Sequence, residues 1–511
     1  MNKKIAVLAA AFAAVSMMPS VTDAAAVTAN VPVGSVYYTY LDKLNGMGYI
    51  DDLPNGAKPY SRMQMAKWVM QAEANAKLRP MPAYLKDQLR ELEHYVAPEI
   101  EVLKGKADQD NLAMRDMSLE LTNYNSDKSE YDYARPHTAS WQPFQGKNGY
   151  HYADGFNAVL KGTFSGNVGH ETALSITPRV SWNDDDDTEL KLEEGYVKTR
   201  TGVFEWEAGR EALTWGQGKT GTFTVSNTVK PLTAIQVHLQ DDRPMHGFFR
   251  FLGKQNYHAF YAQLEDDRSD VAKRTHSGTD YDDAGLLGLR ADYTPTDYFT
   301  FGLARVSMLG GDGSHLSGND WGKWLVAKNS GREKDRWDDI AGGDFRFRLP
   351  GVQFYGEVYG EDAGGLTPTE RAYRFGVYLP QLTRDGSWDM TAEYASTNNY
   401  WYVHQRYNNG WTYSGDIIGD NMGNNARKYY VDVNHYMPGN VTLGAYFQRT
   451  EYTRDVLNNP TVNEAAVRGS AKVSDNMFLN ASLGVAKINS ADFTSRGDRD
   501  VFATAGLQWQ Y

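Results

Sequence analysis

The sequence predicts an all-β transmembrane β-barrel of about 18 antiparallel strands with a small N-terminal α-helical module. Hydrophobic and polar residues alternate with a period of two over most of the chain. The composition combines 33 Tyr, 12 Trp and 48 Gly with a low mean hydropathy of -0.58, and the chain opens with the pattern of an export signal. This combination is typical of barrels, because only every second strand residue meets lipid while Tyr and Trp gather at the two membrane interfaces.

Residues 1–26 have the pattern of a secretory signal peptide. Lys3 and Lys4 give the positive start, residues 5–15 the apolar stretch, and residues 24–26 a cleavage site of three alanines. The apolar stretch is shorter than the roughly 20 residues that a spanning helix needs, and no other segment approaches that length. No cysteine follows the signal to carry a lipid anchor. We therefore expect export, followed by insertion into the outer membrane as a barrel.

Residues 27–106 have helical periodicity and are expected to form a small module on the periplasmic side. A first helix is predicted to end at Gly48, with an apolar face made of Tyr37, Tyr40, Leu41, Leu44 and Met47. A second helix is predicted after the candidate N-cap Ser61, with the apolar stripe Met65, Trp68, Val69 and Ala72. A third stretch covers residues 83–103 and either packs on the first two helices or self-associates.

Residues 107–511 are expected to form the barrel. The last strand shows the alternation best, with one face made of Val501, Ala503, Ala505, Leu507, Trp509 and Tyr511. Turn sequences such as Met437-Pro438-Gly439-Asn440 separate such segments. The aromatic C-terminal residue is typical of chains that the outer-membrane insertion machinery receives, so this machinery and outer-membrane lipid are expected partners. Because period two does not say which face meets lipid, a soluble all-β solenoid or a pair of sandwiches is the alternative.

The composition and motifs also exclude several classes of function. Without cysteine, the chain has no disulfide framework, CxxC metal site or thiol nucleophile. The net charge of -12 argues against a nucleic-acid partner, which requires a basic face. GxSxG, HExxH, Walker A and dinucleotide motifs are absent, and the carboxylates Asp184 to Asp187 lack EF-hand spacing, so a solvated hairpin tip is expected there. We predict no enzyme, no metal site and no cofactor.

Three carboxylates on one predicted strand, Glu357, Glu361 and Asp362, need a separate argument because glycosidases use carboxylate pairs. On a strand, Glu357 and Glu361 share a face but lie about 13 Å apart, which exceeds both glycosidase geometries. If they face the lumen, we expect them to bond to arginines of neighbouring strands, namely Arg346, Arg348, Arg371 or Arg374.

Several motifs in order along residues 150–511 resemble a known family. The first lie within 195–239: Glu205-Trp206-Glu207-Ala208-Gly209-Arg210-Glu211, Trp215-Gly216-Gln217-Gly218, Ser226-Asn227 and Lys230-Pro231. Later motifs are Gly302-Leu303-Ala304-Arg305, Gly310-Gly311-Asp312-Gly313, the segment 355–362 and the segment 407–427. Together they resemble the capsule-assembly Wzi family of outer-membrane proteins. The resemblance implies an 18-stranded barrel above a small helical domain, which acts as a lectin and holds capsular polysaccharide on the cell surface.

Residues 36–75 also resemble a single divergent S-layer homology module. The resemblance rests on Leu44, Gly48, Pro59 and Ser61-Arg62 ahead of an Ala-Lys-Trp-Val helix. In other bacteria such modules grip cell-wall polymer. The resemblance therefore implies that cell-wall polymer is a further partner, bound through the N-terminal module.

Polysaccharide binding requires aromatic faces for stacking and polar or charged groups for the hydroxyls and any acidic sugars. Two loop-like segments supply both kinds of side chain. The candidates are Trp321, Trp324, Arg332, Arg336, Trp337, Tyr400, Trp401, Tyr402, Tyr407 and Trp411. The competing interpretation is that these rings form an interface girdle or plug the lumen.

We predict a lectin that attaches or retains capsular polysaccharide at the cell surface. The alternative is a diffusion porin that is tethered to the cell wall by its N-terminal module, and a third reading is a purely structural tether between membrane and wall. The state of the lumen distinguishes the lectin from the porin. A porin needs an open, charged eyelet, whereas a lectin barrel of this family is plugged.

Overall fold

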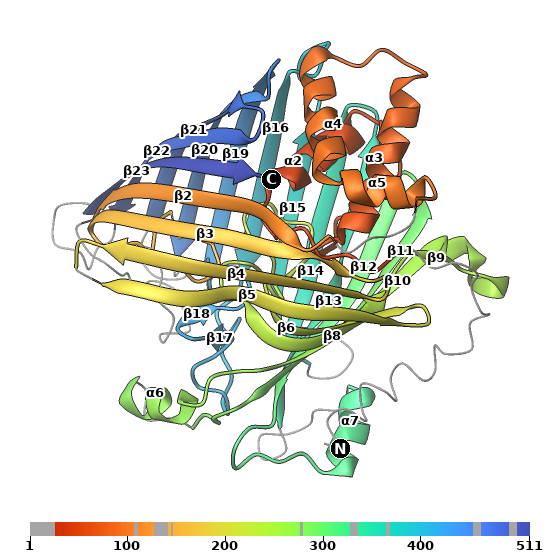
Figure 1. Ribbon diagram of the computed structural model, residues 1–511. Helices are drawn as coiled ribbons and strands as arrows, with labels where there is room; N and C mark the ends of the chain where they lie inside the picture. Colours follow the sequence, from red (N-terminus) through yellow and green to blue (C-terminus); the bar gives the residue numbers. More distant parts are fainter. Residues whose placement is uncertain are drawn as a thin grey trace.

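The computed structural model describes residues 26–106, 111–126, 142–144, 147–185, 187–275, 279–327, 336–363, 368–452, 461–489 and 498–511. Within these residues, 18 antiparallel strands close into one barrel, and a group of helices lies at one of its ends (Figure 1). The predicted fold class is therefore confirmed. Apart from Ala26, the predicted signal peptide lies outside the described residues.

Four helices follow one another at what we call the helical end of the barrel: α2 (Val36–Gly46), α3 (Arg62–Ala76), α4 (Ala83–Tyr95) and α5 (Ala97–Leu103). Ser61 caps α3 as predicted and forms a capping box with Gln64. The third stretch, expected as one helix, is divided in two. Pro98 lies in the first turn of α5, and because proline has no N–H to donate to the preceding turn, one continuous helix is disfavoured.

The helices share a core of their own. Most of the apolar residues predicted for it are buried, including Leu41, Leu44, Met65 and Val69 at 0% exposure, whereas Met47 and Trp68 are partly buried. The rings of Tyr37 and Tyr95 stack with centroids 3.9 Å apart. In the described part of the chain, no helix has the length and apolarity needed to cross a membrane.

The barrel strands run up and down in sequence order, and β23 pairs with β2 to close the sheet. Their bounds are β2 (Ala113–Asn125), β3 (Gly155–Val168), β4 (Thr172–Asn183), β5 (Thr188–Thr201), β6 (Phe204–Glu211), β8 (Leu232–Leu239) continued by β9 (Arg243–Pro244), β10 (Lys254–Gln263), β11 (Gly285–Thr296), β12 (Phe299–Leu309), β13 (Trp337–Leu349), β14 (Val352–Ala363), β15 (Pro368–Leu379), β16 (Trp388–Thr397), β19 (Ala426–Met437), β20 (Val441–Tyr452), β21 (Thr461–Ser474), β22 (Met477–Asn489) and β23 (Asp498–Gln510).

Short turns join the strands at the helical end, and longer connections join them at the opposite end, which we call the loop end (Figure 1). The predicted turn at Pro438-Gly439-Asn440 is one of the short ones, with positive φ at both Gly439 and Asn440. The loop-end connections contain α6 (Arg268–Thr275), α7 (Gly318–Leu325) and the small hairpin β17 (Thr412–Tyr413) and β18 (Asp416–Ile417).

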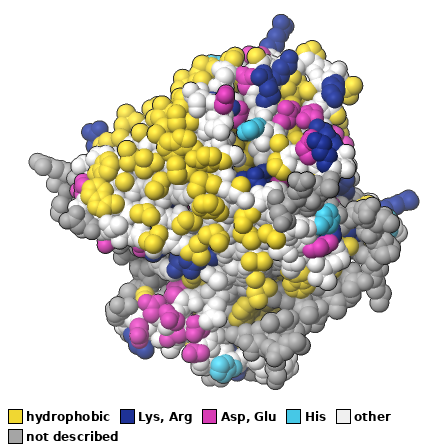
Figure 2. Space-filling view, in the orientation of Figure 1, with side chains coloured by type: hydrophobic (Ala, Val, Ile, Leu, Met, Phe, Trp, Pro, Cys, Tyr) yellow, Lys and Arg dark blue, Asp and Glu magenta, His cyan; other side chains and the backbone are white. Residues whose placement is uncertain are grey.

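The strands alternate in the way that a membrane-spanning barrel requires. On β22, Leu479 and Leu483 are 43% and 56% exposed, whereas Phe478 and Ala486 between the outward positions are buried. Figure 2 shows hydrophobic side chains gathered in a broad band over β2, β3 and the neighbouring strands. An outward apolar band around a closed sheet is the surface that meets lipid.

Candidate functional site

Two long connections fold back into the lumen from the loop end. We call residues 212–231, between β6 and β8, and residues 398–425, between β16 and β19, the plug. Most of their apolar side chains are buried and share one core with inward-facing residues of the wall such as Phe260 and Ile340. The two connections also bond to each other: Trp411 Nε1 donates to Thr224 O at 2.9 Å, and the Tyr402 hydroxyl donates to Phe223 O at 2.8 Å.

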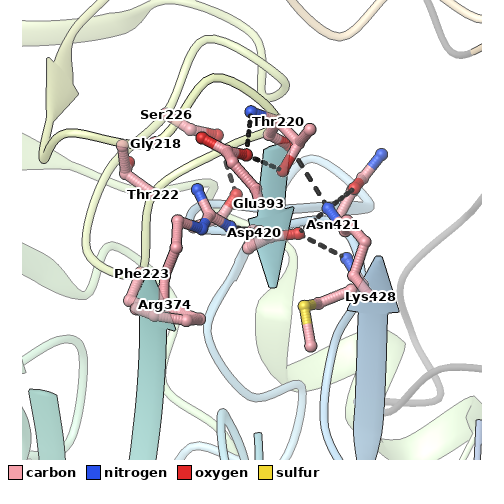
Figure 3. A network of polar contacts seen from close by, with 12 residues as sticks. Gly218, Thr220, Thr222, Phe223, Ser226, Arg374, Glu393, Asp420, Asn421 and Lys428 are labelled. Carbon is pink, nitrogen blue, oxygen red and sulfur yellow. Dashed lines mark hydrogen bonds and ion pairs between the residues drawn. The ribbon is translucent and has the colours of Figure 1, made fainter. Parts of the chain in front are cut away.

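A polar network ties the plug to the wall (Figure 3). Asp420 of the plug forms ion pairs with Arg374 of β15 and with Lys428 Nζ of β19, the latter at 2.5 Å. Glu393 of β16 accepts hydrogen bonds from the Thr220 backbone N–H at 3.1 Å and the Thr220 hydroxyl at 2.9 Å. Charged side chains of three wall strands thus hold both connections of the plug.

At the Trp-Gly-Gln-Gly motif noted in the sequence, the backbone of the plug packs closely against the wall. The backbone N–H groups of Gln217 and Gly218 donate to Glu357 Oε1 at 2.8 and 2.7 Å. A Cβ atom on Gly218 would lie 1.6 Å from Arg374 Nη1 and 2.1 Å from the carbonyl oxygen of Gly221. Only glycine fits at position 218, so the close packing of plug and wall explains why the motif has a glycine there.

The helical end is closed by the polar face of α2. Asp42 forms an ion pair with Lys219 of the plug, and Lys43 Nζ lies 3.3 Å from Asp389 of β16. Asn45 Oδ1 accepts hydrogen bonds from Arg348 Nε at 3.1 Å and Gln353 Nε2 at 3.0 Å. In a soluble protein the polar face of such a helix would contact water. Here the polar side chains of α2 contact polar groups inside the barrel.

The helical module and the plug meet inside the barrel. The short strand β1 (Ala57–Lys58) pairs with β7 (Thr214–Trp215), and Gly216 N donates to Gly56 O at 2.8 Å. Backbone pairing therefore joins segments that enter the lumen from opposite ends.

The packing leaves hollows between plug, helices and wall. One of about 870 Å³ lies beside α2 and is lined by hydroxyl and charged groups, among them Tyr430, Tyr446 and Arg468. Another of about 360 Å³ lies between α3 and strands β6, β8 and β10. Both linings combine polar groups with apolar side chains, which suits a ligand that presents hydroxyl groups as well as an apolar face.

Comparisons with known proteins place the chain in a family. A family profile described as "Capsule assembly protein Wzi" matches residues 128–501. The chain belongs to this family. An uncharacterized 55.8 kDa protein in the cps region of Klebsiella pneumoniae is 25% identical over 170 residues, which is 32% of this chain and 32% of that protein. The match thus spans about a third of that relative's length.

A solved structure has the same fold. It is Wzi of Escherichia coli, described as an outer-membrane protein involved in group 1 capsule assembly and as a carbohydrate-binding β-barrel. The two chains are 18% identical and superimpose with a TM-score of 0.69, covering 94% of this chain and 99% of the other. At this identity the likeness shows the shared barrel.

Five of the ten residues predicted from the sequence as sugar contacts lie in the plug of this Wzi-family barrel, and four of these five are fully buried. Trp401, Tyr402, Tyr407 and Trp411 are each 0% exposed. A fully buried ring has no free face for a sugar, so in this structure these rings stabilise the plug, which is the competing interpretation given for them. They lie close together, as their short spacing in the sequence suggests.

Four further candidates come from the connection between β12 and β13, and Trp337 is the first residue of β13. Trp324 and Trp337 are 1% exposed and pack with Leu287 and Leu309 of the wall. Trp321 is partly buried against this cluster, and the Arg336 side chain is 42% exposed, with its Nη1 3.6 Å from Asp320. Arg332 lies outside the described residues.

Tyr400 is the remaining candidate and is 65% exposed. The candidates with solvent-accessible surface, Tyr400, Trp321 and Arg336, therefore come from two different loop-end connections. The sequence analysis did not single out Glu393 or Lys428, and it included Asp420 only within the family-like segment 407–427. The only available signal was a charged residue between two outward apolar positions, as in Tyr373-Arg374-Phe375.

Glu357 and Glu361 both face the lumen, where they accept hydrogen bonds from backbone N–H groups of the plug. Glu357 is fully buried in the lumen and stands opposite Arg374 in the register of β14 and β15. Glu361 is also buried, but its Oε2 accepts a hydrogen bond at 2.6 Å from the backbone N–H of Tyr402, so it holds the plug as well. Both carboxylates are engaged by the protein itself.

Proposed function

We propose that this protein acts in capsule assembly at the outer membrane, where it binds capsular polysaccharide and retains it at the cell surface. Membership of the capsule-assembly family supports this role. The observation that carries the proposal is the filled lumen: the plug enters from one end, α2 closes the other, and β1 pairs with β7 between them. A barrel filled in this way offers its loop end as a binding surface, whereas a porin needs an open eyelet.

The proposed orientation places the loop end outside the cell and the helical end in the periplasm. Short turns at one end and long connections at the other support it, because outer-membrane barrels have short periplasmic turns and long extracellular loops. In this scheme residues 1–26 are removed on export, residues 27–106 form the periplasmic module, and residues 107–511 form the barrel. The insertion machinery recognises the C-terminal aromatic residue.

Polysaccharide contact is proposed for the loop-end side chains that keep solvent-accessible surface, Tyr400, Trp321 and Arg336, with Arg332 as a further candidate. Their chemistry suits the ligand, since rings stack on sugar faces and guanidinium groups pair with acidic sugars. The role needs binding without catalysis and without a cofactor. Among the described residues, no three histidine or acidic side chains are grouped to hold a metal ion.

A second candidate role is attachment to cell-wall polymer through residues 36–75. The observation that favours it is the hollow of about 360 Å³ beside α3, which is lined by Tyr60, Trp68 and Lys58. Burial lowers the pKa of Lys58 to about 8, which leaves this lysine largely protonated at neutral pH. Co-sedimentation with purified cell-wall sacculi, comparing wild type with Trp68→Ala, tests the role. Equal sedimentation of the two proteins would show that this hollow does not bind cell-wall polymer.

The main proposal is tested by single-channel conductance of the refolded protein in a planar bilayer, together with a pull-down of surface polysaccharide from the source cells. We expect silent traces and retained polysaccharide. Large, stable currents would overturn the plugged-lectin proposal and favour the porin. Silent traces without retained polysaccharide would reject the binding role while leaving the plug intact.

A further inference from the structure

An exposed aromatic turn lies at the helical end, on the side of the barrel away from the lumen. The 3₁₀ helix η1 (Gly247–Leu252) connects β9 to β10 and has no buried residue. Phe248, Phe249 and Phe251 are 84%, 51% and 62% exposed, and their rings contact one another with centroids 5.3 to 6.5 Å apart. We call these three residues the phenylalanine triad. Clustered exposed rings of this size are unusual on a surface that faces only water.

A short stem holds the triad in place. β9 pairs with the start of β10 through Arg243 and Pro244, and Met245 N donates to Gly253 O at 2.7 Å to close the turn. Gly247 and Gly253 have φ of 65° and 71°, which glycine adopts without strain where the turn leaves and rejoins the stem. In Figure 1 the β9 hairpin extends sideways from the wall, at the right of the view. The 3₁₀ helix that carries the triad therefore projects beyond the wall.

The turn leaves the wall at the level of an aromatic row on the lipid-facing side. This row runs across β10 to β13 and consists of Tyr257, Tyr293, Phe301, Phe299 and Phe347, with neighbouring centroids 5.1 to 6.5 Å apart. Gly253 bridges to Thr294, the residue next to Tyr293. This bridge fixes the base of the triad's turn beside the row.

We propose that the phenylalanine triad inserts into the lipid leaflet at the helical end and anchors this side of the barrel in the membrane interface. The aromatic row marks the depth of that interface, because aromatic side chains of barrels gather where hydrocarbon meets headgroups. Arg250 lies within the triad and is exposed, which suits contact with lipid phosphates while its neighbours enter the acyl region. The anchor opposes tilting of the barrel on the side where the β9 hairpin projects.

The absence of native cysteine allows a direct test. Phe249→Cys in the full chain is labelled with a nitroxide and placed in nanodiscs of phosphatidylethanolamine and phosphatidylglycerol. Collision rates with oxygen and with a water-soluble nickel complex report the depth of the label. Leu483→Cys on the lipid-facing side of β22 is the membrane reference, and Leu78→Cys, which is 83% exposed after α3, is the aqueous reference.

We expect the ratio of oxygen to nickel collision rates at position 249 to be several-fold above that at position 78 and below that at position 483. A ratio equal to that at position 78 overturns the proposal. The label could also show the collision ratio of an aqueous site in nanodiscs and yet be immobilised in isolated outer membranes. This result would mean that the triad binds a protein partner, and it would again reject the lipid anchor. Phe248→Cys repeats the measurement at a second position, so a local defect at 249 does not decide the result.

Discussion

Arg374 on β15 and Asp420 in the plug form an ion pair in which neither side chain is exposed to solvent. The other carboxylate oxygen of Asp420 lies 2.5 Å from Lys428 Nζ, and this lysine side chain is 2% exposed. One carboxylate of the plug therefore compensates two buried cations of the wall. Because an unpaired buried charge is costly, the position of residues 398–425 in the lumen depends on Asp420.

We expect Asp420→Ala to loosen the plug, because two buried cations lose their common partner at a cost of about 3–5 kcal/mol. Single-channel recordings in a planar bilayer should then show larger and more frequent currents than the wild type. Asn421→Ala is the matched control, since Asn421 accepts only a long hydrogen bond of 3.4 Å from Lys428. Silent traces from Asp420→Ala would contradict the prediction and mean that apolar contacts alone hold the plug.

The barrel could be predicted because the alternation of apolar and polar residues that indicates it lies within each single strand. Each strand must alternate along its own length, so residues such as Leu479 and Leu483 indicate their face without any knowledge of neighbouring strands. The cap at Ser61 is equally local, since a serine hydroxyl and a glutamine three residues later bond within one turn. The break at Pro98 was also local but was missed, because leucines at helical spacing continue up to Val96.

The plug was not predictable in the same way. Aromatic clusters in residues 398–416 were recognised as candidates, but their direction depends on partners far away in the sequence. Trp411 bonds to Thr224 across 187 residues, and Tyr402 bonds to Phe223 across 179 residues. Likewise, the polar face of α2 has the pattern of a solvated face, and only the polar lumen of the closed barrel explains why Lys43 is buried.

Asp42 provides a prediction for the contact between α2 and the plug. Burial by itself would raise the pKa of Asp42, but the charges of Lys219, Lys58 and Arg346 outweigh it and hold this pKa well below its ordinary value. A folded-state pKa below the unfolded value of about 3.9 stabilises the folded state above that pH. This contribution is lost as the pH falls further, through the folded-state pKa.

We therefore expect Asp42→Asn to lower the free energy of unfolding by about 1.5–3 kcal/mol at pH 7, the range for hydrogen bonds to charged groups. The difference from wild type should stay constant from pH 8 down to about pH 4 and shrink below it. Urea unfolding in detergent micelles, followed by tryptophan fluorescence, measures it. A difference that stays constant below pH 4 would mean that the pKa of Asp42 in the folded state is at its ordinary value.

A matched pair of substitutions tests the membrane-spanning face. Leu483 lies at the middle of β22, and Leu479 lies on the same face about 13 Å nearer the helical end. Leu483→Arg should cost about 2–4 kcal/mol, whereas Leu479→Arg near the interface should cost about 0–1 kcal/mol. Urea titration of the protein refolded in lipid vesicles measures both. Equal costs would show that this face does not cross a hydrocarbon core.

Tyr400 and Trp401 are adjacent in the chain, yet Tyr400 is 65% exposed and Trp401 is 0% exposed. If the exposed ring stacks on a sugar, Tyr400→Ala should weaken polysaccharide binding about two- to tenfold, which corresponds to roughly 0.5–1.5 kcal/mol for one aromatic contact. Its unfolding and its silent conductance should match the wild type. Trp401→Ala instead removes a ring from the core of the plug, so it should cost about 3–5 kcal/mol of stability and produce current. Binding isotherms and bilayer recordings on both variants separate the two roles, and unchanged binding by Tyr400→Ala would remove this ring from the proposed polysaccharide surface.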